Sequence, residues 1–161
     1  MTERVAWPWA PAILAACATT WGTAVVFGSI VMAMRGAPSL GEWIVGFAMV
    51  MVVPFAAMAV CVLWPTLRVG CRLSRRDDRR TRVWLAILAA PLQFCALLVA
   101  GRVLWGYWPG HASSLASALA GLGVLGLALL VAFLAGGLTA AAVGPVRANQ
   151  IREPSHVPTR A

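Results

Sequence analysis

The stretch LASALAGLGVLGLALLVAFLAGGLTAAAVGPV, residues 115–146, contains no charged side chain. A helix needs about 20 apolar residues to cross a bilayer core about 30 Å thick, and this stretch exceeds that length. Three further runs meet the same requirement, at residues 10–34, 43–67 and 83–108. The sequence therefore predicts an all-α integral membrane protein, a bundle of four transmembrane helices within residues 1–146.

The composition excludes an ordinary soluble domain. Of the 161 residues, 61% are hydrophobic and only 11% are charged, and the mean hydropathy is +0.83. The first apolar run is longer than the 7–15 residues of a signal-peptide core, so we expect it to stay in the mature protein. All thirteen basic residues are arginine, which is typical of GC-rich bacterial genomes and favours the bacterial cytoplasmic membrane.

The arginines flank the four runs unevenly, and cytoplasmic loops carry the excess of basic residues in membrane proteins. Only Arg35 and Arg102 lie on one side, whereas the other eleven share the opposite side. We therefore expect both termini and the segment 68–82 in the cytoplasm. The tail 147–161 lacks apolar periodicity, and its composition predicts disorder.

Tryptophans support the same topology, because indole prefers the headgroup level of a membrane. One group falls at the predicted inner interface: Trp7, Trp9, Trp64 and Trp84. Trp43, Trp105 and Trp108 fall at the outer interface, and Trp21 alone is deep.

Two of the runs carry small residues at four-residue intervals, which is the spacing that lets helix backbones approach closely in a membrane. These helix-packing candidates are Ala12, Ala16, Thr20, Ala24 and Gly28 in the first run and Ala128, Ala132, Gly136, Ala140 and Gly144 in the fourth. We expect the two stripes to touch, although they could instead bind a partner subunit or arise by chance from the composition.

Prolines interrupt the second and third runs. Pro54 and Pro91 each remove one backbone donor, so a kink is expected at both. Gln93 is the only amide side chain near the bilayer midplane, where it could hydrogen-bond a freed carbonyl or a neighbouring helix. A ligand-binding role for Gln93 is the less favoured alternative.

Polar side chains gather at the predicted outer face. They are Arg35, Glu42, Arg102, Tyr107 and His111. An ion pair between Glu42 and Arg102 would lower the cost of placing both charges near the interface. Any small-molecule site is expected in this cluster.

The segment 68–82 combines seven arginines with only two acidic residues, Asp77 and Asp78. The arginines are Arg68, Arg72, Arg75, Arg76, Arg79, Arg80 and Arg82. We expect them to fix the topology and to lie against anionic lipid headgroups, each contributing about 1 kcal/mol near the surface. Docking to an acidic protein is an alternative, whereas the short segment lacks any nucleic-acid-binding module.

Chemistry inside the membrane has few candidate groups. No Asp or Glu lies within a predicted span, which argues against ion-coupled transport by this chain alone. His111 and His156 fall on opposite sides, and Cys17, Cys61, Cys71 and Cys95 form no CxxC pair, so no cofactor or metal is expected.

These features favour a noncatalytic accessory, assembly or interaction subunit of a membrane complex, with another membrane protein or a second copy as its partner. An oligomeric pore or permease-like component is the alternative, and it would line its path with Gln93, Arg102 and the threonines of the first run. A membrane enzyme acting through the outer cluster is less favoured, because the spans contain no histidine or carboxylate base.

Overall fold

The computed structural model describes residues 7–34, 36, 39–106 and 115–146. The helices are α1 (Ala10–Met34), α2 (Leu40–Met58), the π-helical turn η1 (Ala59–Leu63), α3 (Trp64–Ser74), α4 (Arg79–Gly106) and α5 (Leu115–Val143). Within these residues there are no strands, and four helical segments are long and apolar enough to cross a membrane. The prediction of an all-helical fold with four helices able to span a membrane is confirmed for these residues.

Most of the arginine-rich segment 68–82 is helical. α2, η1 and α3 follow one another without a break, and α3 ends at Ser74, whereas α4 begins at Arg79. Only residues 75–78 separate the two helices, so most of the segment 68–82 belongs to α3 and α4. α3 continues because it packs on α4: a Cβ on Gly70 would collide with the Leu85 side chain.

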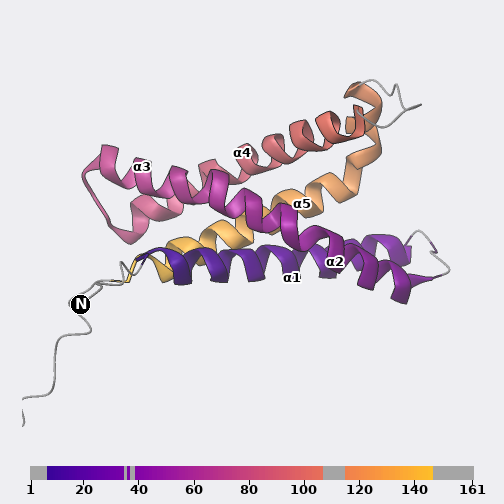
Figure 1. The fold of residues 1–161 in the computed structure, drawn as a ribbon, viewed down its shortest axis with the longest axis horizontal. Coiled ribbons are helices and arrows are strands. Elements are labelled where there is room, and N and C mark those ends of the chain that lie inside the picture. The colour runs from indigo at the N-terminus through magenta and orange to yellow at the C-terminus, as the bar shows by residue number, and fades with distance from the viewer. Residues whose placement is uncertain (1–6, 35, 37–38, 107–114, 147–161) are drawn as a thin grey trace, which may run out of the picture.

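α5 lies at the centre of the bundle. Its most extensive contact is with α1 and its next is with α4, whereas α2 packs mainly on α1. Figure 1 shows the start of α1, the α3–α4 turn and the end of α5 together at one end of the molecule. We call this the arginine-rich end, and there the Val146 amide donates a hydrogen bond to the Pro8 carbonyl over 2.9 Å.

Two apolar clusters fill the interior. The cluster nearer the arginine-rich end consists largely of alanines with Trp9, Leu63 and Leu67, and the other contains Phe55 and Phe133. The rings of Phe55 and Phe133 meet edge to face, with centroids 5.5 Å apart. Small residues thus bring the backbones together, and a few large side chains fill the remaining space.

The helices depart from α geometry at two places. In η1 the Trp64 amide bonds to the Ala59 carbonyl, five residues back, immediately before Pro65. Gly123, with φ +25° and ψ −115°, breaks the regular geometry of α5. α2 and α4 remain helical on both sides of Pro54 and Pro91, and the kinks at these prolines stay a prediction.

Candidate functional site

The two stripes of small residues lie inside the bundle. All ten of their residues are buried, and nine of them lie in α1 and α5, which form the most extensive helix contact. The tenth, Gly144, directly follows α5. At the closest point a Cβ on Gly136 would overlap the Thr20 hydroxyl and lie 2.8 Å from the Ala16 carbonyl oxygen. The structure therefore brings the predicted stripes together within one chain, so these faces are not open to a partner.

Trp21, the tryptophan predicted to lie deep, connects α1 to α2. Its Nε1 donates a hydrogen bond to the Ala48 carbonyl over 2.8 Å. Because a carbonyl within a helix retains a second lone pair, this bond adds a polar tie between the two helices without breaking α2. The sequence predicted that Trp21 lies deep, but it did not predict its hydrogen bond to Ala48.

Gln93 is the most buried polar side chain in the structure as described, at 2% exposure. Its Oε1 has no hydrogen-bond partner among the described residues. An amide oxygen buried without a donor destabilises the folded state by about 1–3 kcal/mol. Gln93 is thus a buried amide whose Oε1 accepts no hydrogen bond across helices from the described residues.

Replacing Gln93 by leucine should therefore raise the free energy of unfolding by about 1 kcal/mol, since leucine fills similar space without a polar atom. The measurement is equilibrium unfolding of the purified protein in mixed micelles. A loss of stability would mean that Gln93 has a partner that these residues do not include.

The outer polar cluster does not form the predicted ion pair. Glu42 and Arg102 are both exposed, and among the described residues the only ion pair joins Arg82 to Asp77. The pair fails because α2 and α4 make little contact. In Figure 1 the start of α2 and the end of α4 lie on opposite sides of the bundle. Arg35, Tyr107 and His111 lie outside the described residues.

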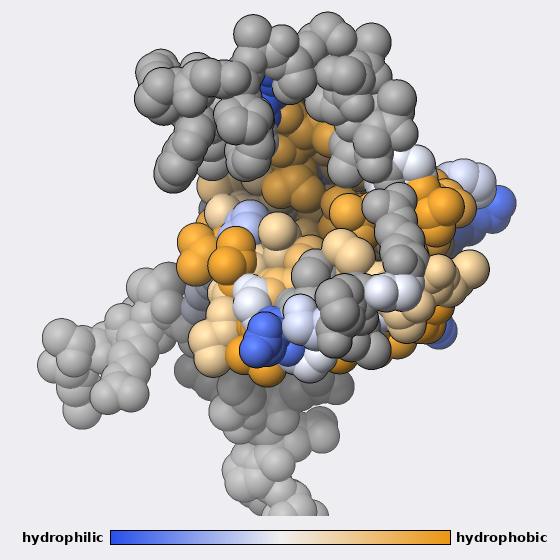
Figure 2. Space-filling view, turned by 90° about the vertical axis from the view of Figure 1, so that its right-hand side faces the viewer, coloured by the Kyte–Doolittle hydropathy of each residue, from blue (hydrophilic) through white to orange (hydrophobic). Residues whose placement is uncertain are grey.

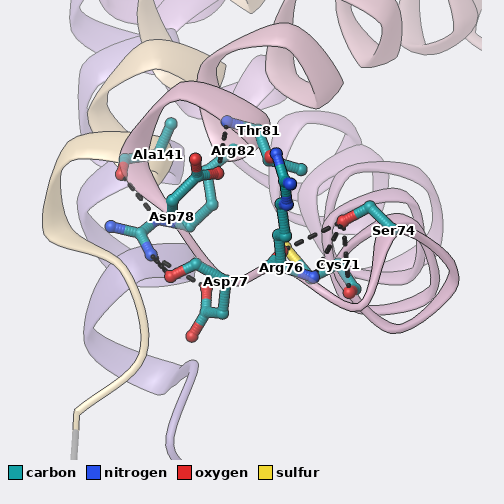
Figure 3. Close-up of polar contacts among 8 residues, drawn as sticks. All are labelled: Cys71, Ser74, Arg76, Asp77, Asp78, Thr81, Arg82 and Ala141. Carbon is teal, nitrogen blue, oxygen red and sulfur yellow. Dashed lines mark hydrogen bonds and ion pairs between the residues drawn. The ribbon is translucent and has the colours of Figure 1, made fainter.

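Arg82 closes the carboxyl end of α5 (Figure 3). The Ala141 carbonyl would ordinarily accept a bond from residue 145, but Pro145 has no amide hydrogen. The Arg82 Nε donates to this carbonyl instead, over 3.0 Å, and Nη1 pairs with the Asp77 carboxylate at 2.8 Å. Gly144 leaves room for the guanidinium, since a Cβ there would lie 3.1 Å from the Arg82 Cζ.

This cap gives Arg82 a role inside the protein that the sequence did not reveal. Its side chain is 14% exposed, and a cation at a helix carboxyl end is favoured by the helix dipole. Gly144, with φ +63°, ends the helix in the left-handed conformation that favours glycine. The arginines still exposed here are Arg68, Arg72, Arg75, Arg76, Arg79 and Arg80.

Asp78 caps the amino end of α4. Its Oδ1 accepts a hydrogen bond from the Thr81 amide over 2.9 Å. Hydrogen bonds from the side chain and backbone of Thr81 lower the pKa of the Asp78 carboxyl. The capping carboxylate is therefore more stable in the folded protein than in the unfolded chain.

The cap should make stability depend on pH. Because folding lowers the pKa of Asp78, its contribution is complete above the unfolded pKa and is lost as pH falls through the folded pKa. At neutral pH we expect the wild-type protein to have a higher midpoint of thermal unfolding than the Asp78→Asn variant. In acid this difference should vanish. A difference independent of pH would show that the charge does not matter.

A pocket of about 330 Å³ opens at the arginine-rich end. It is lined by Trp7, Pro8, Trp9, Arg68, Cys71, Arg72, Asp77 and Pro145. The Arg68 guanidinium lies over the Trp64 ring, 5.2 Å from its centroid, and Trp7 meets the same ring edge to face at 5.2 Å. The four-residue spacing of Arg68 and Arg72 on α3, with Trp64 one turn before them, could have indicated this site from the sequence.

The interior of the described residues is almost entirely apolar. Thr20 and Gln93 are its only buried polar side chains, and no group of three His, Cys, Asp or Glu residues in the same ranges could hold a metal ion. The four cysteines are all unpaired.

Known proteins give no guide to the function of this chain. No protein-family model, no curated protein and no solved structure matches this chain significantly. The described residues form an all-helical fold with four potential membrane spans, and the function must be inferred from this structure.

Proposed function

We propose that the chain is a noncatalytic accessory or interaction subunit of a membrane complex, and that α2 is the helix that contacts its partner. The small-residue stripes of α1 and α5 already pack against each other within the chain. A partner must therefore bind to a surface of this chain other than these small-residue faces.

The observation that carries this proposal is the exposure of α2. In the most apolar stretch of the span containing α2, 11% of the residues are buried, against 44% in the span formed by α5. Its exposed side chains include Val45, Met49, Val50, Val52 and Val53. Methionine and valine on one open helix suit packing against another helix, since methionine adapts to irregular surfaces.

Photo-crosslinking tests where the partner binds. A photoreactive residue at Met49 or Val53 of α2 should crosslink to one defined protein in native membranes. Leu88 of α4, also exposed, is the control and should yield lipid adducts. Only lipid adducts at both α2 positions would refute α2 as the contact surface.

We also propose that the protein lies in a bacterial cytoplasmic membrane, with the arginine-rich end in the cytoplasm beside anionic headgroups. The clustering of exposed arginines at one end supports this orientation. A fluorescent protein fused to the carboxyl end should therefore fluoresce, and alkaline phosphatase fused there should be inactive. The reverse pattern would show that the carboxyl end lies outside the cytoplasm and would contradict the proposed topology.

The oligomeric pore remains the second hypothesis, but the fold gives it little support. Thr20 packs against Gly136, and Gln93 is buried within one chain. Neither side chain faces outward, so a path between subunits would have to be lined by other residues. Reconstituted flux that falls on changing the exposed Arg102 would favour it nevertheless.

A further inference from the structure

The pocket at the arginine-rich end has the charge of an anion site. Arg68 and Arg72, one turn apart on α3, both line it. Asp77 is the only acidic residue in the lining, and its carboxylate already pairs with Arg82 at 2.8 Å. Two guanidinium groups thus remain for a ligand, and arginine is well suited to phosphate oxygens.

The pocket is also partly preorganised. Arg68 is held by the Trp64 ring, and Trp7 supports that ring from its edge. The Trp64 Nε1 is buried and has no hydrogen-bond partner among the described residues. A buried donor without an acceptor is unfavourable, and this one belongs to the ring that supports Arg68 rather than to the lining of the pocket.

The other walls of the pocket are apolar and belong at the headgroup level. Trp7, Pro8, Trp9 and Pro145 lie beside the arginines. Tryptophan with arginine at the end of a membrane helix is typical of the interface between lipid and water. At about 330 Å³ the pocket falls in the lower part of the range for small-ligand sites, about 300–1,000 Å³.

We propose that this pocket binds the phosphate group of one anionic phospholipid, of the phosphatidylglycerol class, with Arg68 and Arg72 as its ligands. The inference rests on the proposed placement of this end at a membrane surface. It replaces a diffuse attraction between lipids and all seven arginines by one defined site. Arg82 is excluded from that site by its role at the end of α5.

Lipid titration followed by native mass spectrometry of the detergent-solubilised protein tests the proposal. Phosphatidylglycerol should bind as a single tight adduct, about tenfold more tightly than zwitterionic phosphatidylcholine. The pocket variant Arg68→Gln/Arg72→Gln should lose about tenfold in affinity. The control Arg79→Gln/Arg80→Gln removes the same charge from exposed positions outside the pocket and should bind like wild type.

Three results would overturn the proposal. Equal losses in the two double variants would show a diffuse electrostatic effect, and equal binding of the two lipids by wild type would show no headgroup selectivity. Displacement of the lipid by inorganic phosphate at the same concentration would assign the site to a soluble anion.

A second readout uses the wild-type pocket and does not depend on the arginine variants. Cys71 lines the pocket, so a chain retaining only this cysteine, with Cys17, Cys61 and Cys95 changed to serine, reports on occupancy. Phosphatidylglycerol should slow maleimide modification of Cys71 several-fold compared with phosphatidylcholine, and equal rates would contradict the proposal. Both readouts are independent of any protein partner, so failure of this site is distinguishable from failure of the proposed function.

Discussion

Changing Gly136 to alanine should destabilise the protein by about 3 kcal/mol or more, whereas changing Gly22 to alanine should have little effect. The added methyl group at Gly136 would overlap the Thr20 hydroxyl and press on the Ala16 carbonyl, so α1 and α5 would have to separate. A Cβ on Gly22 meets nothing within 4 Å. The two variants make the same chemical change in membrane helices and differ only in the space available.

Equilibrium unfolding in mixed micelles measures the free energy of unfolding of both variants. Adding Thr20→Ala to Gly136→Ala should recover part of the loss, because the hydroxyl is the closest obstacle. The recovery should be incomplete, since the Ala16 carbonyl oxygen remains 2.8 Å from the new Cβ. Similar stabilities for the Gly136 and Gly22 variants would mean that α1 and α5 do not meet at this crossing.

The second large effect is expected at Arg82. Replacing Arg82 by alanine should lower the free energy of unfolding by about 2–3 kcal/mol. Most of the loss comes from the Ala141 carbonyl, which would then have no hydrogen-bond donor. Pro145 has no amide hydrogen to replace the lost guanidinium. The Asp77 ion pair contributes less, because that carboxylate is 43% exposed.

Arg80→Ala is the matched control, since Arg80 is exposed on the same segment. Its effect should stay within about 0.5 kcal/mol. Hydrogen exchange localises the change: amides near the end of α5 should exchange faster in the Arg82 variant only. Equal behaviour of the two variants would show that Arg82 does not cap α5.

The membrane spans were predictable because a long apolar run has few alternatives to a transmembrane helix. α1 begins and ends where the sequence placed it, at Ala10 and Met34. The stripes of small residues could be read at fixed spacing, and the structure shows that they meet within the chain. Local composition and periodicity carry this kind of information directly.

The polar contacts could not be read in the same way. Counting arginines along residues 68–82 predicts which side of a membrane they occupy, but it treats Arg82 like its neighbours. Only the fold shows that Pro145 frees a carbonyl beside it, since the two residues are far apart in sequence. The Glu42–Arg102 pair failed for the complementary reason: equal predicted depth does not make α2 and α4 neighbours.

The central claim is that this chain works as a bound subunit, and the mass of the intact particle tests it most directly. The protein would be extracted from its native membrane in polymer-bounded lipid discs, without detergent, and weighed by native mass spectrometry. We predict one 17.0 kDa chain together with a different membrane protein in a fixed ratio. A particle containing only lipid and a single 17.0 kDa chain would contradict the account.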